Sequence, residues 1–299
     1  MTPITRRPAR FLPPLQVLLL LSAPLRAQAP ASPAVPADAI PRHETFRIDS
    51  RVLAEQRTIN VYTPPGYDHA PHGRFPVVYM PDGGMAEDFP HVANTLDSLI
   101  ALRAVPPLIL VGIENAERRR DLTGPTRVAQ DSTIAPRVGG SAAFRGFIRE
   151  ELIPWVRGRY RTTGETAIVG ESLAGLFIVE TFLLEPGLFR RYIALSPSVW
   201  WNDGALVASA ARHLRRLDGK RRVLFLSAAD EPGIADGTAA LADTIRTLAP
   251  PGLLLLYEPR PDLEHSTIFR AVAPEAFVRV LGNWTAPGSE PEAPARPGR

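Results

Sequence analysis

The sequence predicts an α/β protein whose central, mostly parallel sheet is covered by helices on both faces. The first observation is that short apolar runs of strand length alternate with stretches of helical spacing over most of the chain. The second is that these runs are almost continuously apolar, as in strands buried on both faces. The third is a turn, Gly170-Glu171-Ser172, that follows one such run, where parallel sheets place their sites.

The expected elements follow one another in a regular order. Strands are expected at residues 45–50, 57–63, 75–80, 107–113, 166–169, 192–195, 222–226 and 253–257. Helices are expected at residues 92–103, 141–157, 173–184, 238–248 and 274–281. The first two strands alternate apolar and polar residues, so they are expected to be half-buried. Pro154 is expected to bend the second helix, because proline lacks an amide hydrogen.

The net charge of +3 is concentrated at the start of the chain. The sequence has 34 Lys and Arg against 31 Asp and Glu. Residues 1–29 contain Arg6, Arg7, Arg10 and Arg26 and no acidic residue, so 30 basic side chains remain against 31 acidic ones beyond them. This balance leaves no broad positive field, and we expect no nucleic-acid partner.

Residues 1–29 have the pattern of a secretory signal peptide. The basic residues precede a short apolar run at residues 15–21, and Ala27-Gln28-Ala29 fits a cleavage site. We expect a linker at 30–41, one catalytic domain at 42–285 and a disordered tail at 286–299. The chain has no cysteine, and no other run is long enough to span a bilayer. A periplasmic or secreted protein without a membrane anchor is therefore expected.

Ser172 is the predicted nucleophile. The apolar run 166–169 leads into Gly170-Glu171-Ser172-Leu173-Ala174-Gly175, and helical spacing follows. This resembles the nucleophile elbow of the α/β-hydrolase fold, whose pattern is G-x-S-x-G. Ala174 departs from the usual glycine, although Gly175 comes one residue later. The alternative is a serine that only caps the following helix.

His265 is the predicted general base, since in this fold the histidine follows the serine and the acid in the chain. Of the two histidines beyond Ser172, His213 lies in a helical stretch, whereas His265 follows the last strand. The acid is expected after the strand 222–226, where Asp230 and Glu231 both qualify. Either carboxylate would orient the histidine and stabilise its charged form.

Backbone amides are expected to form the oxyanion hole. Leu173 follows the nucleophile and supplies one N–H, and Gly83 or Gly84, in the loop after the strand 75–80, is expected to supply the other. Glycines there would let the backbone approach the substrate closely. Asp82 is expected to brace this loop.

Taken together, these motifs resemble those of the esterase family that includes esterase D, the periplasmic enterochelin esterases, feruloyl esterases and mycolyltransferases. The matching segments are residues 81–84, 111–115 with 120–121, 170–175, 196–202 and 264–267. The resemblance covers about residues 44–283. It implies an α/β-hydrolase fold, a serine nucleophile, a small carboxylic-ester substrate, and neither a cofactor nor a metal.

The resemblance also favours Glu231 over Asp230, because the family often has a glutamate at that point. Trp200 and Trp201 are candidates to line the acyl or aromatic pocket, and the alternative is that one of them belongs to the core. Arg120 is a candidate contact for an anionic siderophore, and the alternative is a solvated loop. The leading hypothesis is a serine esterase acting on siderophore or aryl esters. The alternatives are an acyltransferase with the same triad and a non-catalytic ligand-binding protein on this scaffold.

Overall fold

The computed structural model of the protein describes residues 40–284, and every structural statement below concerns this part of the chain. The expected signal peptide and disordered tail lie outside it, as does nearly all of the expected linker. These three assignments remain predictions.

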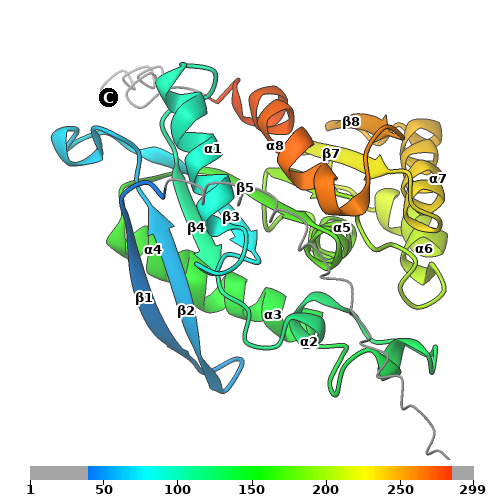
Figure 1. The fold of residues 1–299 in the computed structure, drawn as a ribbon. Coiled ribbons are helices and arrows are strands. Elements are labelled where there is room, and N and C mark those ends of the chain that lie inside the picture. The colour runs from blue at the N-terminus through cyan, green and yellow to red at the C-terminus, as the bar shows by residue number, and fades with distance from the viewer. Residues whose placement is uncertain (1–39, 285–299) are drawn as a thin grey trace, which may run out of the picture. The chain divides into compact units, whose positions relative to one another are not determined.

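The described residues form one eight-stranded sheet, and most of its strands are parallel (Figure 1). The strand order is β1-β2-β4-β3-β5-β6-β7-β8. The first pairings, β1 with β2 and β2 with β4, are antiparallel, and all pairings from β3 to β8 are parallel. The strands are β1 (His43–Ser50), β2 (Glu55–Tyr62), β3 (Phe75–Pro81), β4 (Ile109–Ile113), β5 (Thr162–Glu171), β6 (Arg191–Leu195), β7 (Arg222–Ala229) and β8 (Leu253–Arg260). The predicted fold class is confirmed.

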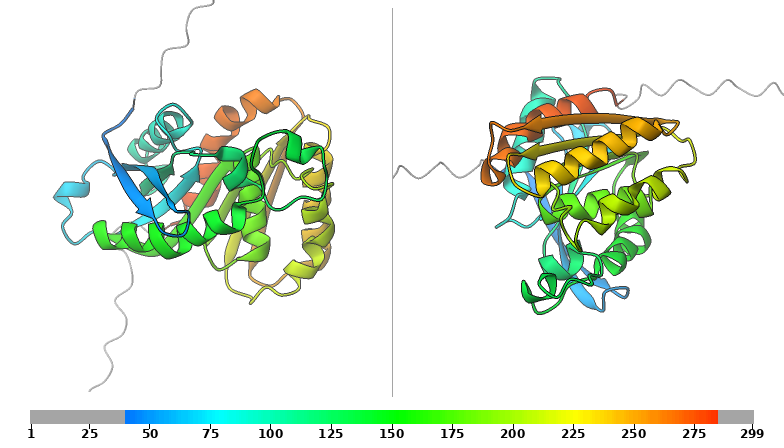
Figure 2. Two further views of the ribbon diagram at one scale, coloured as in Figure 1. Left: turned by 90° about the horizontal axis from the view of Figure 1, so that it is seen from below. Right: turned by 90° about the vertical axis from the view of Figure 1, so that its right-hand side faces the viewer.

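Helices cover both faces of this sheet, as the turned views of Figure 2 also show. Successive residues of a strand point to opposite faces. In β3, Val77 and Tyr79 pack into the core on the side of α3 to α7, whereas Val78 and Met80 pack against α1 and α8. The helices are α1 (Phe89–Ala101), α2 (Arg118–Leu122), α3 (Ser141–Phe147), α4 (Ile153–Arg159), α5 (Leu173–Leu184), α6 (Ala205–Leu214), α7 (Ile234–Leu248) and α8 (His265–Leu281).

The last helix begins nine residues earlier than predicted. We expected it to start at Pro274, because proline suits the first turn of a helix. Instead α8 starts at His265 and contains Pro274 in its interior. The start is fixed by a capping box, in which the Glu264 side chain accepts the N–H of Thr267 and the Thr267 hydroxyl accepts the N–H of Glu264. This capping places His265 in the first turn of the helix.

The helix predicted at 141–157 is continuous but contains a π-helical turn. The turn spans Ile148–Leu152 and joins α3 to α4. Pro154, which has no amide hydrogen, is the second residue of α4 directly after this turn, and the N–H of Ile153 donates to Ile148 O across the turn. Of helix α6, only the helical stretch around His213 was expected, and the helix begins at Ala205.

A buried ion-pair network joins β2 to α2. The side chains of Arg57 and Asp121 are each only 1% exposed and form an ion pair with one another. Arg57 Nη2 is also 2.7 Å from a carboxylate oxygen of Glu55. Arg120 donates to both Glu55 oxygens, at 2.9 and 2.6 Å, and its Nε lies 2.7 Å from Asp121. This network holds α2 against the sheet.

Replacing Arg57 by leucine is expected to lower the free energy of unfolding by about 3 kcal/mol, because the Asp121 carboxylate would lose a partner while remaining buried. Urea unfolding measures the difference. Arg51→Leu is the matched control, since Arg51 is 94% exposed and lies 3.7 Å from Glu151. Equal losses in the two variants would contradict the importance of the buried pair.

Candidate active site

The carboxyl ends of the parallel strands bring together most of the residues predicted from the sequence. Ser172 follows β5, Glu231 follows β7 by two residues, and His265 follows the loop after β8. Because β3 to β8 run in one direction, these three loops lie at the same edge of the sheet (Figure 1). Asp82, after β3, and Arg118, beyond β4, start from this edge as well.

Ser172 occupies a strained turn between β5 and α5. Its backbone has φ 60° and ψ −119°, a conformation that disfavours residues other than glycine. The turn is held by backbone bonds to the next strand and its loop: Ser172 N–H donates to Leu195 O, and Ser198 N–H donates to Ser172 O, both at 3.0 Å. Such a turn projects the serine side chain out of the sheet, as a nucleophile elbow requires.

The small residues around Ser172 allow tight packing behind it. A Cβ on Gly170 would lie 2.6 Å from the Cβ of Ala174, and a Cβ on Gly175 would lie 2.9 Å from Pro197 Cα. Ala174 therefore fits in place of the usual glycine because Gly170 opposite it has no side chain.

Ser172, His265 and Glu231 form a chain of polar contacts. The Oγ of Ser172 is 2.9 Å from the Nε2 of His265. The Nδ1 of His265 is 2.7 Å from Oε2 of Glu231. The second contact has a hydrogen-bond distance, but its direction departs from that of a good hydrogen bond, since neither atom has a partner of acceptable geometry. The Glu231 side chain is 38% exposed, but its Oε2 atom, which faces the histidine, is buried.

Asp230, the other candidate acid, is not part of this chain of contacts. Its side chain is exposed, and its backbone N–H donates to Leu263 O at 3.2 Å. The geometry therefore favours Glu231 of the two acids that the sequence offered.

Glu171 is a second carboxylate at the histidine, and sequence reasoning assigned it no role. Its Oε1 lies 3.0 Å from the Nε2 of His265, the same nitrogen that faces Ser172. Burial raises the pKa of Glu171 to about 8. The negative charges of Asp82, Asp88 and Glu231 act in the same direction, and the guanidinium of Arg118 acts against them. Glu171 is therefore predominantly protonated at neutral pH.

The predicted oxyanion donors differ in their availability. The N–H of Leu173 donates to no backbone or side-chain acceptor among the described residues. Gly83, by contrast, donates to Ile113 O at 3.0 Å, and Gly84 donates to Oε2 of Glu87 at 2.7 Å. Neither glycine N–H is therefore free in this structure, and the expectation that one of them serves as an oxyanion donor stays a prediction.

Gly83 is needed for a close approach of backbone to backbone rather than to substrate. A Cβ at Gly83 would lie 2.3 Å from Gly112 Cα, so any larger residue would separate the loop from β4. The Gly83 carbonyl is also used, since it accepts a hydrogen bond from the Asn60 side chain at 2.8 Å. Both backbone groups thus fix the loop to the sheet.

Asp82 braces its loop, as predicted. Its carboxylate forms a bidentate pair with Arg118, at 2.7 and 2.8 Å, and also accepts a hydrogen bond from Asn115. The Asn115 side chain bonds Glu87 at 2.7 Å as well. Of the three consecutive arginines at 118–120, Arg118 is thus the one whose charge acts on Asp82 and Glu171 in the active site.

Two predicted substrate contacts are corrected. Trp201 is 4% exposed, belongs to the core, and donates its indole N–H to Gly124 O at 2.8 Å. Arg120 is held in the ion-pair network beneath α2. Trp200 is 39% exposed, and its Cβ lies 3.6 Å from where a Cβ on Gly233 would stand, so it remains next to the Glu231 loop.

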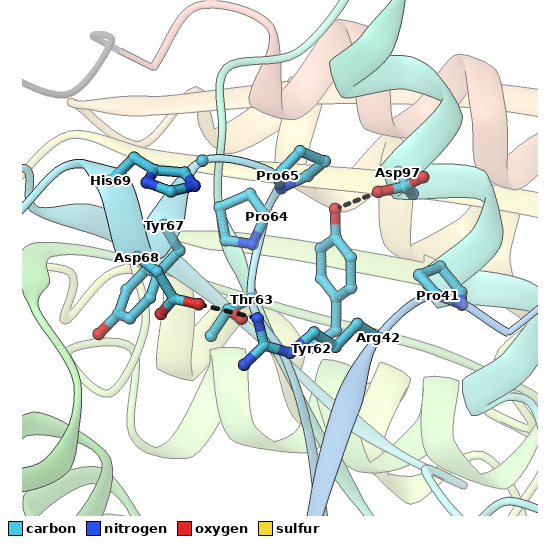
Figure 3. A pocket seen from close by; sticks show the side chains of 11 residues that line it. Pro41, Arg42, Tyr62, Thr63, Pro64, Pro65, Tyr67, Asp68, His69 and Asp97 are labelled. Atoms are coloured by element: carbon cyan, nitrogen blue, oxygen red, sulfur yellow. Dashed lines mark hydrogen bonds and ion pairs between the residues drawn. The ribbon is translucent and has the colours of Figure 1, made fainter.

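Other parts of residues 40–284 have several cavities, of about 170 to 610 Å³, that are not lined by Ser172, Glu231 or His265. These parts contain no group of three or more His, Asp or Glu side chains placed to hold a metal ion. A cavity of about 290 Å³ lies beside Tyr62 and Asp97, whose side chains bond at 2.8 Å, and its lining includes none of the residues around Ser172 (Figure 3). No helix in this range is both long and apolar enough to cross a membrane.

Known proteins resemble this chain in sequence and in fold. Residues 50–230 match the protein family described as "Putative esterase". The chain belongs to this esterase family. A curated relative, the ferri-bacillibactin esterase BesA of Bacillus subtilis, is 32% identical over 183 residues, which cover 54% of this chain and 61% of the relative. The siderophore enterobactin esterase of Emericella nidulans is 35% identical over 79 residues, covering 25% and 26% of the two chains.

Solved structures show the same fold. An IroE-like serine hydrolase from Shewanella oneidensis has a TM-score of 0.72 at 28% identity, with 80% of this chain and 79% of that chain covered. The siderophore hydrolase EstA from Aspergillus nidulans has a TM-score of 0.70 at 20% identity, with 86% and 98% covered. The latter likeness concerns the fold alone.

Replacing Glu171 by glutamine is expected to stabilise the protein increasingly as the pH rises. Between pH 4.5 and about 8, the unfolded chain ionises Glu171 while the folded protein keeps it protonated, so wild-type folding is progressively opposed. Relative to wild type, the variant should gain up to about 1.4 kcal/mol per pH unit across this window. Urea unfolding at both ends of the window measures the gain. A difference that does not change with pH would contradict the raised pKa.

Proposed function

We propose that this protein is a serine esterase that hydrolyses carboxylic esters through an acyl-enzyme. The observation that carries the proposal is the chain of contacts from Ser172 through His265 to Glu231, at 2.9 and 2.7 Å. Ser172 itself lies in a strained turn. Family membership supports the same reaction class.

In the proposed reaction, Ser172 Oγ attacks the ester carbonyl while its proton passes to Nε2 of His265. Glu231 orients the imidazole through Nδ1 and stabilises the imidazolium that forms. The proton then passes to the leaving alcohol, and water attacks the acyl-enzyme by the same route. The free N–H of Leu173 stabilises the oxyanion. Displacement of Glu87 by substrate would release the N–H of Gly84 as a second donor.

For the substrate, we propose a siderophore-type or aryl ester without a large negative charge. The names of the relatives support a siderophore ester. The local charges limit the choice of ester, because the carboxyl groups of Asp82, Asp88 and Glu231 surround Glu171. Two cations oppose these charges, since Arg118 faces the group and Arg270 faces Asp88. Such a field disfavours a strongly anionic ferric catecholate relative to an uncharged siderophore ester or a feruloyl ester.

Ser172→Ala is expected to lower esterase activity by at least about 1000-fold, because the nucleophile is lost while the fold is retained. Hydrolysis of 4-nitrophenyl acetate measures the activity, and labelling by a fluorophosphonate probe measures the nucleophile directly. Wild-type protein should be labelled and the variant should not.

The same variant controls a substrate panel of feruloyl sugar esters, an uncharged hydroxamate siderophore ester and a tri-catecholate lactone. Full activity of Ser172→Ala would refute the proposed nucleophile. An acyl group that appears on an added alcohol instead of in the free acid would identify an acyltransferase. Ligand binding without labelling would indicate a non-catalytic binding protein.

Glu231→Gln is expected to reduce kcat by about 100-fold, since the neutral amide cannot stabilise the imidazolium. Asp230→Asn is the matched control, because it removes the adjacent carboxylate, which does not contact His265. Steady-state kinetics on both variants separate the two acids. The assignment of Glu231 fails if Asp230→Asn proves the more damaging change.

A further inference from the structure

Glu171 stands directly before the nucleophile, yet the proposed reaction gives it no task. We propose that Glu171 is a positioning residue that competes with Ser172 for Nε2 of His265, so that esterase activity depends on the ionisation of Glu171. This inference rests on the proposed function and adds a means of regulation to the same site.

The competition follows from the geometry at one nitrogen. Nε2 of His265 lies 2.9 Å from the Oγ of Ser172 and 3.0 Å from Oε1 of Glu171. A neutral imidazole has one lone pair on its unprotonated nitrogen, so Nε2 can accept only one of these two groups as a donor. The other ring nitrogen is not an alternative acceptor, since Nδ1 faces Glu231.

Glu171 has few other ways to satisfy its carboxyl group. The side chain is 16% exposed, and its Oε1 is buried without a hydrogen bond of acceptable geometry to any described residue. A protonated carboxyl is a stronger hydrogen-bond donor than a serine hydroxyl. When protonated, Glu171 should therefore displace Ser172 from Nε2.

The charges around Glu171 keep it protonated near neutral pH. They come from five parts of the fold: Asp82 after β3, Asp88 before α1, Arg118 on α2, Glu231 after β7 and His265 at the start of α8. Burial and the three carboxylates favour the neutral form, and Arg118 opposes it, with the result that the pKa is about 8. Burial also raises the pKa of Asp88, to about 6.

The proton balance determines the active form. While Glu171 holds its proton, its O–H can donate to the lone pair of Nε2, and that nitrogen then cannot accept from Ser172. Once the carboxyl has lost its proton, Glu171 has only acceptor oxygens, so Nε2 becomes free to accept the proton of Ser172. Activity should thus rise as Glu171 ionises.

The test is the pH profile of kcat/KM for 4-nitrophenyl acetate in wild type and in Glu171→Gln. Glutamine has nearly the same size but does not ionise, so the midpoint of the profile should fall by about one pH unit or more. Arg118→Gln should move the midpoint upward, because it removes the cation that favours ionised Glu171. Asp230→Asn, which also removes one carboxylate, should leave the midpoint within about half a pH unit of wild type.

A structural role alone would lower activity without moving the midpoint. The proposal is overturned if Glu171→Gln and a second variant, Glu171→Ala, both keep the midpoint within about half a pH unit of wild type or raise it. Loss of the proposed function itself gives a different result, since wild-type protein would then show neither Ser172-dependent hydrolysis nor fluorophosphonate labelling at any pH.

Discussion

The position of Ser172 depends on the backbone of the turn after β5, because two main-chain hydrogen bonds tie that turn to the next strand and its loop. A serine with φ 60° and ψ −119° costs about 1–3 kcal/mol, which the surrounding structure must offset. The bonds to Leu195 and Ser198 supply part of this, and they exist only because β5 and β6 are parallel neighbours in register. The nucleophile is thus positioned by the sheet, with no help needed from its own side chain.

The same parallel sheet explains why residues far apart in the sequence meet. Ser172 and His265 are separated by 93 residues, but the loops after β5 and β8 emerge at one edge. The final adjustment comes from the capping box of Glu264 and Thr267, which starts α8 at His265. A helix that began at Pro274 would have left the histidine in an unconstrained loop. Capping is therefore part of how the site is built.

The fold class was predictable from the sequence, because strand runs and turn motifs are local signals. Of the four triad candidates that the sequence offered, the structure brings Ser172, His265 and Glu231 into contact. What could not be predicted depends on tertiary contacts. Trp201 and Trp200 are adjacent in sequence and equally aromatic, but only Trp201 finds a buried acceptor for its N–H. Arg118 and Arg120 also differ in their tertiary partners. Arg118 pairs with Asp82 in the loop after β3, whereas Arg120 pairs with Glu55 of β2. Gly83 was expected to bring the backbone close to the substrate, but in the structure it packs closely against the backbone of β4.

The sequence pattern gives no indication of a role for Glu171, because the turn does not constrain the middle residue of a G-x-S motif. Its significance appears only when α8, α2 and the loops after β3 and β7 surround it with charge. A buried carboxyl with a raised pKa opposes folding at the pH values where it should ionise, and an aliphatic residue there would avoid that cost. A glutamate at this position is explained if its carboxyl group acts on Nε2 of His265, which lies 3.0 Å away. The stability lost at Glu171 and its contact with the histidine then have one physical cause, which is the placement of a largely buried titratable group against the base.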